Sequence, residues 1–293
     1  MKVAVISDVH GNLPALQTAV ADVDKWQPDV VVVNGDIVNR GPCSLTCWQL
    51  IQTLAQQHGW HILKGNHEEY VLECAQPLYQ PNGPSLQIRQ YAQWTYEQLD
   101  GHIAAIAALP DQYSLTAPDG RELRAVHAAM GNNRTGIYPE TPDAEIEKLI
   151  APPPNIFITA HTHRPLLRQI GPTLVVNIGS VGAPFDEDKR LSYGRFTWTA
   201  RQGWQSEIVR LPYDWQQTIR DYVTSGFLEH GGPLAQIMLV EHRKSRGLIY
   251  RWATRYQEAV LKGQLTLADS VRLVLQDEDL RPYLGPPGWE AFP

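Results

Sequence analysis

Short, continuous runs of apolar residues recur along the first part of the chain. They occupy residues 2–7, 29–34, 60–64, 122–127, 156–160 and 173–178. Apolar runs of this length, without polar alternation, are typical of strands buried on both faces. Between the first two runs, Leu13, Leu16 and Val20 recur at helical spacing, and Asn12 is placed to cap that helix. The pattern therefore predicts a β-α-β start and a sheet covered by helices on each side.

The later pattern adds antiparallel strands and then changes to helices. A second helix is expected from Ser44 and another at about residues 143–150. Aromatic-rich strands follow at 193–199 and 204–210, and from Asp214 the apolar positions have helical spacing. We therefore expect an α/β domain over residues 1–213 and a helical C-terminal extension over residues 214–293. The extension can pack on the first domain, form a homo-oligomer or cover a site, and the pattern does not choose among these.

The composition is that of a soluble globular protein, with 43% hydrophobic and 19% charged residues among 293. The 25 Lys and Arg residues against 31 Asp and Glu residues give a net charge of −6, which disfavours a broad grip on a nucleic-acid backbone. A basic cluster at residues 243–255, with Tyr250 and Trp252 among them, is the one candidate patch. In an acidic chain we interpret it as a solvated helix face.

Two observations bear on location. No apolar run approaches the roughly 18 residues needed to span a bilayer. The N-terminal apolar run meets Asp8 and His10 after a few residues, so it is too short for the core of a signal peptide. We expect a cytoplasmic protein without a membrane partner.

Metal-capable side chains stand at the end of nearly every expected parallel strand. In open α/β sheets the loops that leave the carboxyl ends of the strands converge, and ligands bind there. These positions would therefore aim their side chains at one cavity. They are Asp8, His10, Asp36, Asn66, His67, His127, His161 and His163.

The residue types suit two divalent cations. Imidazoles favour Mn-, Fe-, Zn- or Ni-like ions, and carboxylates supply the negative charge that offsets two dications. Two such ions clamp both oxygens of a phosphoryl displacement and lower the pKa of bound water. The chemistry of the set therefore indicates a binuclear site.

Each motif is weak when taken alone. Asp8-x-His10 places two residues on one face of any extended segment, and Gly35-Asp36 is an ordinary turn pair. His161-x-His163 is stronger, because two imidazoles in a loop after an apolar strand have little reason to pack in a core. Their joint occurrence at successive strand ends carries the interpretation.

The motifs in their order resemble the calcineurin-like metallophosphoesterase superfamily, and in particular its bacterial branch of small phosphodiesterase-like enzymes. The matching segments are ISDVHGN (6–12), GDIVNRG (35–41), GNHE (65–68), VH (126–127) and AHTH (160–163), with NIGSVGAPFDED (177–188) after them. The resemblance covers roughly residues 1–210. It implies a four-layer α/β/β/α sandwich with the helical extension appended.

The resemblance also implies a role for each residue. Asp8, His10 and His163 would hold one metal, while Asn66, His127 and His161 would hold the other and Asp36 would bridge them. His67 would protonate the leaving oxygen or hold the phosphate, and Arg40 matches a phosphate-contacting arginine of the protein-phosphatase branch. Mn²⁺ is the first expectation for the metal, with Fe, Zn or Ni as alternatives.

Three positions depart from the family pattern without removing a ligand. Asn39 stands where the phosphatase branch has an Asp paired to the catalytic histidine, and an amide orients an imidazole without stabilising its charge. Ala160 replaces a Gly before the last histidine pair, and Glu68 replaces the commoner Asp of the bacterial branch.

The expected function is hydrolysis of phosphomonoesters or phosphodiesters through attack by a metal-bridging hydroxide. The expected partner is a small phosphate-ester or nucleotide substrate. Two alternatives stay open: a phosphatase acting on proteins or on dinucleoside polyphosphates, favoured by the GDIVNRG segment with Arg40, and a metal-binding scaffold without activity.

Overall fold

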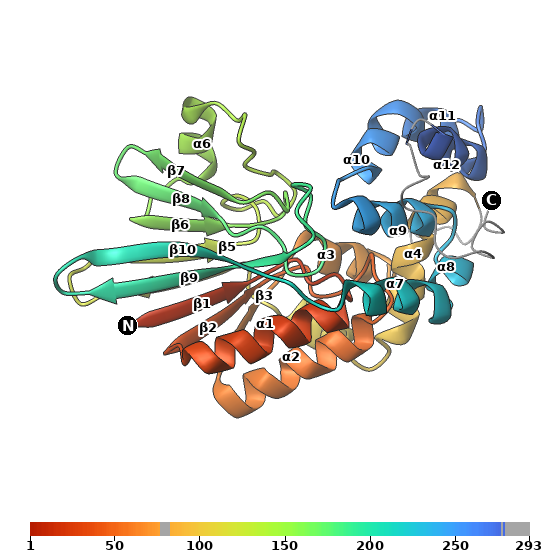
Figure 1. Cartoon of the computed structure of the whole chain (residues 1–293). Coiled ribbons are helices and arrows are strands. Elements are labelled where there is room, and N and C mark those ends of the chain that lie inside the picture. The colour runs from red at the N-terminus through yellow and green to blue at the C-terminus, as the bar shows by residue number, and fades with distance from the viewer. Residues whose placement is uncertain (77–82, 277, 279–293) are drawn as a thin grey trace.

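The computed structural model describes residues 1–76, 83–276 and 278, and stacks two five-stranded sheets between helices (Figure 1). The first sheet has the order β10-β9-β1-β2-β3 and the second β4-β5-β6-β8-β7. The first contains β1 (Lys2–Ile6), β2 (Val30–Asn34), β3 (His61–Leu63), β9 (Leu191–Thr199) and β10 (Gly203–Leu211). The second contains β4 (Gln112–Thr116), β5 (Glu122–Val126), β6 (Ile156–Thr159), β7 (Leu166–Ile170) and β8 (Thr173–Asn177).

The strand pairing confirms the expected mixture of directions. In the first sheet β1, β2 and β3 are parallel, and the β9-β10 hairpin adds antiparallel to β1. In the second sheet β5, β6 and β8 are parallel, with β4 and β7 antiparallel at the two edges. The carboxyl ends of the parallel strands therefore lie together at one end of the sandwich.

Alternate residues of the central strands face different layers. In β1, Ala4 and Ile6 pack toward the helical layer, whereas Val3 and Val5 pack against the second sheet. Both faces are fully buried, as the continuous apolar run predicted. Helices α1 (Leu13–Trp26) and α2 (Ser44–His58) cover the first sheet, and α6 (Asp143–Leu149) covers the second. The four-layer α/β/β/α arrangement is confirmed.

The first helix begins where the sequence indicated. The Oδ1 atom of Asn12 accepts the backbone N–H of Ala15 at 3.2 Å, and Pro14 lies in the first turn. Three helices were not anticipated: α3 (Asn66–Glu73), α4 (Pro84–Gln98) and α5 (Ile103–Ala107). Ile88, Tyr91 and Trp94 give α4 an apolar stripe, and this stripe faces the C-terminal helices instead of a sheet.

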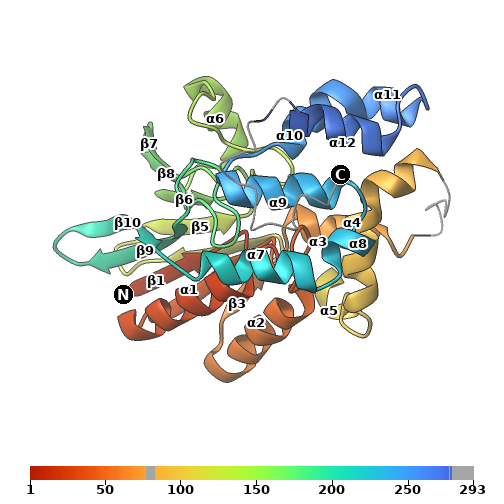
Figure 2. The same cartoon turned by 45° about the vertical axis from the view of Figure 1, so that its right-hand side comes forward.

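The C-terminal extension is helical and packs on the sandwich. Its elements are α7 (Trp215–Thr224), α8 (Phe227–His230), α9 (Leu234–Lys244), α10 (Ile249–Trp252), a π-helical turn (Ala253–Gln257), α11 (Glu258–Leu261) and α12 (Leu267–Gln276). They enclose a separate apolar cluster around Phe227 and Trp252, to which α4 contributes (Figure 2). Residues 279–293 of the expected extension lie outside the described residues.

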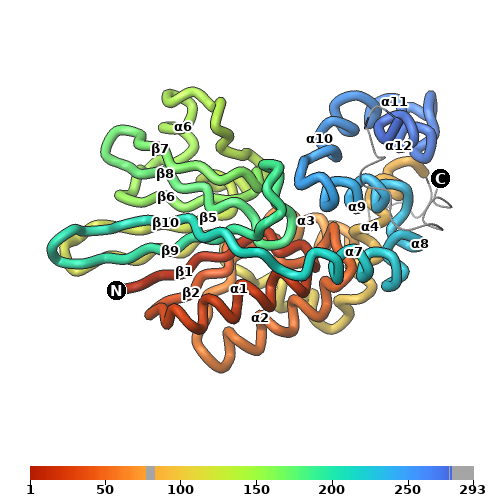
Figure 3. The backbone as a smooth tube through the Cα atoms, in the orientation of Figure 1, coloured from red at the N-terminus to blue at the C-terminus, as the bar shows by residue number. Residues whose placement is uncertain are grey.

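The backbone path places this extension beyond the carboxyl end of β1, where α9 and α7 lie close to α3 and α1 (Figure 3). The extension packs on the first domain through α7 and α1, which is one of the outcomes that the sequence left open. Within the described ranges, no helix is both long and apolar enough to span a membrane.

The expectation of a solvated basic face in the extension is wrong for part of the cluster. Arg243 is 8% exposed, and Lys244 forms an ion pair with Glu278. Arg246 does reach solvent, with 58% of its side chain exposed. Arg243 and Lys244 lie in the last turn of α9, so this part of the basic cluster packs within the extension.

Candidate metal centre

The structure brings the metal-capable side chains of the distant strand ends together. Two groups form, and in each group one ligand atom per residue lies within 4.8 Å of the others. The first group is Asp8, His10, Asp36 and His163, and the second is Asp36, His127 and His161. Asp36 belongs to both groups. Asn66 joins the second, since its Oδ1 atom lies 2.9 Å from His127 Nε2 and 2.8 Å from His161 Nδ1.

The backbone is bent sharply at these positions. Asp8, His10 and Asp36 have φ angles of 53°, 48° and 54°, and His161 and His163 have 61° and 57°. This left-handed conformation is unfavourable for residues with a Cβ atom. It turns the chain at the end of each strand so that the side chains point back to one centre.

A close approach of two loops requires Gly65. A Cβ atom on Gly65 would lie 2.1 Å from Asp36 Oδ1 and 2.6 Å from Asp36 N. No side chain fits there without displacing the shared carboxylate. The glycine thus allows the start of α3 to pack directly against the loop after β2.

Glu68, which the sequence showed only as a replacement for the commoner Asp of the bacterial branch, connects two segments of the site. Its carboxylate is fully buried and accepts the backbone N–H groups of Asp36, Ile37 and Gly65, each at 2.8 Å. Burial and the nearby charge of Asp36 raise the pKa of Glu68 to about 7, despite these hydrogen bonds. Glu68 therefore joins the loop after β2 to the first turn of α3.

The first group has the donor chemistry of a cation site. His163 Nδ1 donates to the carbonyl oxygen of Ala183 at 2.5 Å, which leaves a lone pair on Nε2. That Nε2 atom lies 3.1 Å from Asp8 Oδ1 and 3.1 Å from His10 Nε2. Asp8 Oδ1 is buried and makes no hydrogen bond within the described part of the chain. Lone pairs that converge in this way fit a bound cation.

The second group has the same character. His127 Nδ1 donates to the carbonyl oxygen of Asn34 at 2.9 Å, so its Nε2 lone pair faces Asp36 Oδ2 at 3.3 Å. The side-chain amide of Asn66 lies beside this nitrogen and that of His161, and an amide oxygen at this place would serve as a ligand to a divalent cation.

The charges of the cluster are strongly coupled. Burial raises the pKa of Asp36, but the charge of His127 and that of His67 outweigh it and hold this pKa far below its usual range. Burial lowers the pKa of His127, but Asp36 reverses this and raises it to about 10. Burial and the charge of His127 lower the pKa of His161 to about 4. The charge of Asp36 is thus balanced by a proton on His127, which a bound cation would displace.

His67 lies beside the cluster in a fixed orientation. Its Nδ1 atom lies 3.0 Å from the amide nitrogen of Asn39. The amide oxygen of Asn39 accepts the N–H of Arg40 at 3.0 Å, so its nitrogen is the atom that faces His67. Asn39 therefore donates to Nδ1 of His67, and the ring proton of a neutral His67 resides on Nε2. Burial lowers the pKa of His67 well below its usual value.

Arg40 borders the cluster and has a partner that sequence reasoning missed. One guanidinium nitrogen donates to Glu241 of α9, and the guanidinium carbon lies 5.4 Å from the ring centre of Phe185. That ring stacks on His163 at 4.3 Å. Glu241 carried no local signal in the sequence, because its role depends on how the extension packs. Phe185 lies in the matched segment at residues 177–188, which gave no indication of a contact with Arg40.

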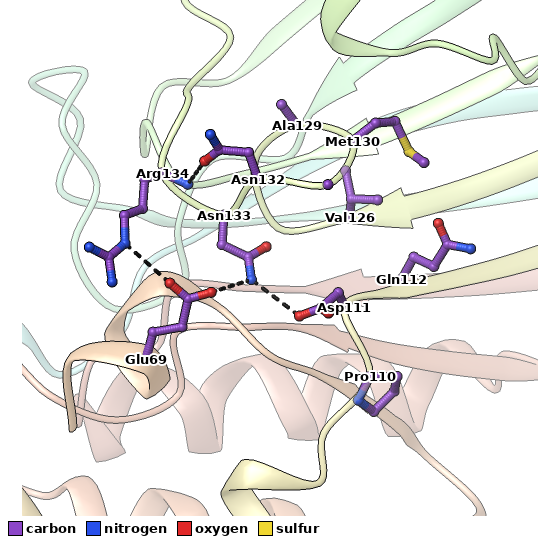
Figure 4. Close-up of a pocket in the computed structure, with 11 residues that line it drawn as sticks. Glu69, Pro110, Asp111, Gln112, Val126, Ala129, Met130, Asn132, Asn133 and Arg134 are labelled. Atoms are coloured by element: carbon purple, nitrogen blue, oxygen red, sulfur yellow. Dashed lines mark hydrogen bonds and ion pairs between the residues drawn. The ribbon is translucent and has the colours of Figure 1, made fainter. Parts of the chain in front are cut away.

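A cavity of about 580 Å³ lies between α3 and the chain segments at residues 110–112 and 129–134 (Figure 4). Glu69 of α3 accepts hydrogen bonds from Asn133 at 3.0 Å and Arg134 at 3.1 Å across this cavity, and Asp111 and Met130 contribute to its lining. The ligand candidates themselves do not line it, but Glu69 and Val126 are close in sequence to Asn66 and His127.

Comparison with known proteins places this architecture in a family. The model of the calcineurin-like phosphoesterase family matches residues 1–182. A metallophosphoesterase from Sphaerobacter thermophilus shares the fold with 22% identity and a TM-score of 0.65, covering 84% of this chain and 99% of its own. A hypothetical protein from Pyrococcus horikoshii OT3 shares it with 18% identity and a TM-score of 0.67, covering 81% of this chain and 97% of its own. The chain therefore belongs to the calcineurin-like phosphoesterase family.

Proposed function

We propose that the protein is a binuclear metal-dependent hydrolase of phosphate esters. The observation that carries this proposal is the pair of ligand groups that share Asp36, with donor atoms converging from six further side chains. Asp8, His10 and His163 would hold one ion, and Asn66, His127 and His161 the other. When bound, two divalent ions supply an activated water near neutral pH and positive charge beside the phosphoryl oxygens.

The chain's own residues have separate tasks in this reaction. His67 presents a neutral Nε2–H beside the cluster, since Asn39 occupies Nδ1 and the ring of His67 lies 4.8 Å from that of His10. This N–H can donate a hydrogen bond to the oxygen of the leaving group and stabilise the negative charge that develops there. Arg40 carries a permanent positive charge next to the cluster and can contact phosphate oxygens.

The cavity beside α3 supports a small substrate with a polar leaving group. Its lining combines the carboxylates of Glu69 and Asp111 with the amide of Asn133, and Met130 adds an apolar surface. Groups of this kind hydrogen-bond a hydroxylated or amine-bearing substituent. We therefore favour small phosphate esters or nucleotides as substrates, with Mn²⁺ as the first metal to try and Fe, Zn and Ni as comparisons.

The test is hydrolysis of an aryl phosphomonoester and an aryl phosphodiester by purified protein with added Mn²⁺. We expect metal-dependent turnover of at least one substrate. His67→Ala should lower this turnover by about 10²-fold or more, because it removes the hydrogen-bond donor to the leaving oxygen, and should leave the metal content unchanged. A protein that binds two ions yet hydrolyses neither ester, nor a phosphopeptide or diadenosine tetraphosphate, would instead support a scaffold role.

A further inference from the structure

The helical extension reaches the rim of the metal centre through Glu241. This residue lies in α9 and its side chain is 3% exposed. Its Oε1 atom accepts the backbone N–H groups of Leu248 at 2.6 Å and Ile249 at 2.8 Å, at the start of α10. The carboxylate is therefore fixed by its own segment, and its second oxygen is left to face the first domain.

That second oxygen holds Arg40. Glu241 Oε2 accepts from Arg40 Nη2, and the Arg40 side chain is 13% exposed. Burial lowers the pKa of Arg40, but Glu241 outweighs burial and raises it, so the guanidinium stays charged. Within the described residues, its Nε and Nη1 atoms make no hydrogen bond. A charged guanidinium thus keeps free donors although it is largely removed from water.

Two further contacts from the extension fix Arg40 in place. The hydroxyl of Tyr222 in α7 donates to the carbonyl oxygen of Arg40 at 2.8 Å, which secures a backbone with a φ angle of 68°. Gly247 packs on Phe185 so closely that an added Cβ atom would lie 3.2 Å from the ring. Phe185 in turn contacts both the guanidinium and the ring of His163.

The guanidinium lies next to the metal cluster. Its carbon is 5.4 Å from the centre of the Phe185 ring, which stacks on His163, and Arg40 directly follows Asn39, whose amide holds His67. With Nη2 tied to Glu241, the Nε and Nη1 donors are left for a phosphate bound at the cluster. Phosphate oxygens bound at the cluster are the acceptors that suit a planar guanidinium.

We propose that Glu241 is a positioning residue that holds the Arg40 guanidinium for contact with the phosphate of the substrate, so that the extension completes the site. This inference rests on the proposed function. In a purely structural role, Glu241 would only fasten α9 to α10, and its loss would change stability without changing phosphate affinity.

The test compares the affinity of inorganic phosphate for the Mn²⁺-loaded protein by titration calorimetry. Glu241→Gln keeps an oxygen for Leu248 and Ile249 but turns an N–H donor toward Arg40, so it removes only the ion pair. We expect about tenfold or weaker phosphate binding in Glu241→Gln and in Arg40→Ala. The double variant should bind no more weakly than Arg40→Ala alone, because both changes remove one contact.

Glu278→Gln is the matched control. Glu278 is also a largely buried carboxylate of the extension, and it pairs with Lys244 and with Arg251 at 2.5 Å. It should leave phosphate affinity unchanged even where it lowers the melting temperature.

Each outcome of this experiment decides between the two roles. Phosphate affinity in Glu241→Gln equal to that of the wild type would overturn the inference, as would a wild-type affinity in Arg40→Ala or a wild-type protein that binds no phosphate. Glu241→Gln could weaken phosphate binding in a protein that hydrolyses no ester. That result would support the inference and refute the proposed reaction.

Discussion

The metal centre and the helical extension differ in how many residues have an unfavourable backbone conformation and how many buried polar atoms lack a hydrogen bond. Ten non-glycine residues in the described ranges have a positive φ angle, and seven of them are cluster residues or their neighbours Asn39 and Arg40. Three of the four buried side-chain atoms without a hydrogen bond also lie there, on Asp8, His10 and Asn34. Within its described residues, the extension has one positive-φ residue of this kind, Ser245, and none of those four atoms.

This difference shows where the fold tolerates strain. A left-handed residue costs about 1–2 kcal/mol, so the cluster is costly to assemble without a ligand. The two apolar layers on the faces of the first sheet hold it in place. In the extension, by contrast, Trp252 is buried and its Nε1 donates to Ser270 at 2.8 Å, as in an ordinary core. Strain is concentrated at the centre that a ligand would stabilise.

The largest expected effect comes from removing the carboxylate that both ligand groups share. Asp36→Asn should lower ester hydrolysis by about 10³-fold or more, since it weakens two cation sites at once. Elemental analysis should find fewer than two ions per chain. Asp143→Asn, which alters an exposed carboxylate paired with Arg168, is the control. Full metal content and activity in Asp36→Asn would show that the two groups are independent.

Removing the metal should destabilise the loops of the metal centre and leave the core of the extension unchanged. Ligand binding at 100 times its dissociation constant stabilises a protein by about 2.7 kcal/mol. Chelation should therefore lower the melting temperature by several degrees. Hydrogen exchange should accelerate in the loops at residues 7–12, 35–41 and 160–164, which carry the strained backbone.

The extension provides the internal reference for this measurement. Exchange in α12 should stay unchanged on chelation, because that helix packs in the separate apolar cluster. Equal acceleration in α12 and in the strand-end loops would mean that the extension and the cluster unfold as one unit.

Local patterns in the sequence were enough for the sandwich and for the set of side chains that meet at the strand ends. The apolar run of β1 ends just before Asp8, and the periodicity of α1 begins at Asn12, so both features lie within a few residues of each other. The direction of each strand then decides at which end its polar residues lie. This is why Asp8, His127 and His161 could be placed together without a structure.

The contacts of the extension could not be found in this way. Arg40 and Glu241 are 201 positions apart, and neither the spacing nor the composition around Glu241 marks it. Glu68 was similarly hidden, because its role is to collect backbone N–H groups, which have no sequence signature. Pairings set by packing between distant elements depend on the whole fold.

The smallest expected effect is a change in how the stability of the protein depends on pH, and it arises from the core of the extension. His242 is buried in contact with Tyr213, Trp215 and Tyr222, and burial, aided by the charges of Lys189 and Arg243, lowers its pKa to about 3. The unfolded chain binds a proton near pH 6.5, whereas the folded chain does so only near pH 3. Stability from this residue is therefore complete above pH 6.5 and falls by about 1.4 kcal/mol per pH unit below it.

His242→Gln should remove this part of the pH dependence, since its side chain does not titrate. The measurement is the unfolding free energy from urea titrations at several pH values between 5 and 7, with the exposed His58→Gln as control. The slope of His242→Gln should be smaller than that of the wild type, whatever its absolute stability. Equal slopes would mean that His242 takes up its proton in the folded state, and that the extension is more open to water than its packing around Trp215 and Tyr222 implies.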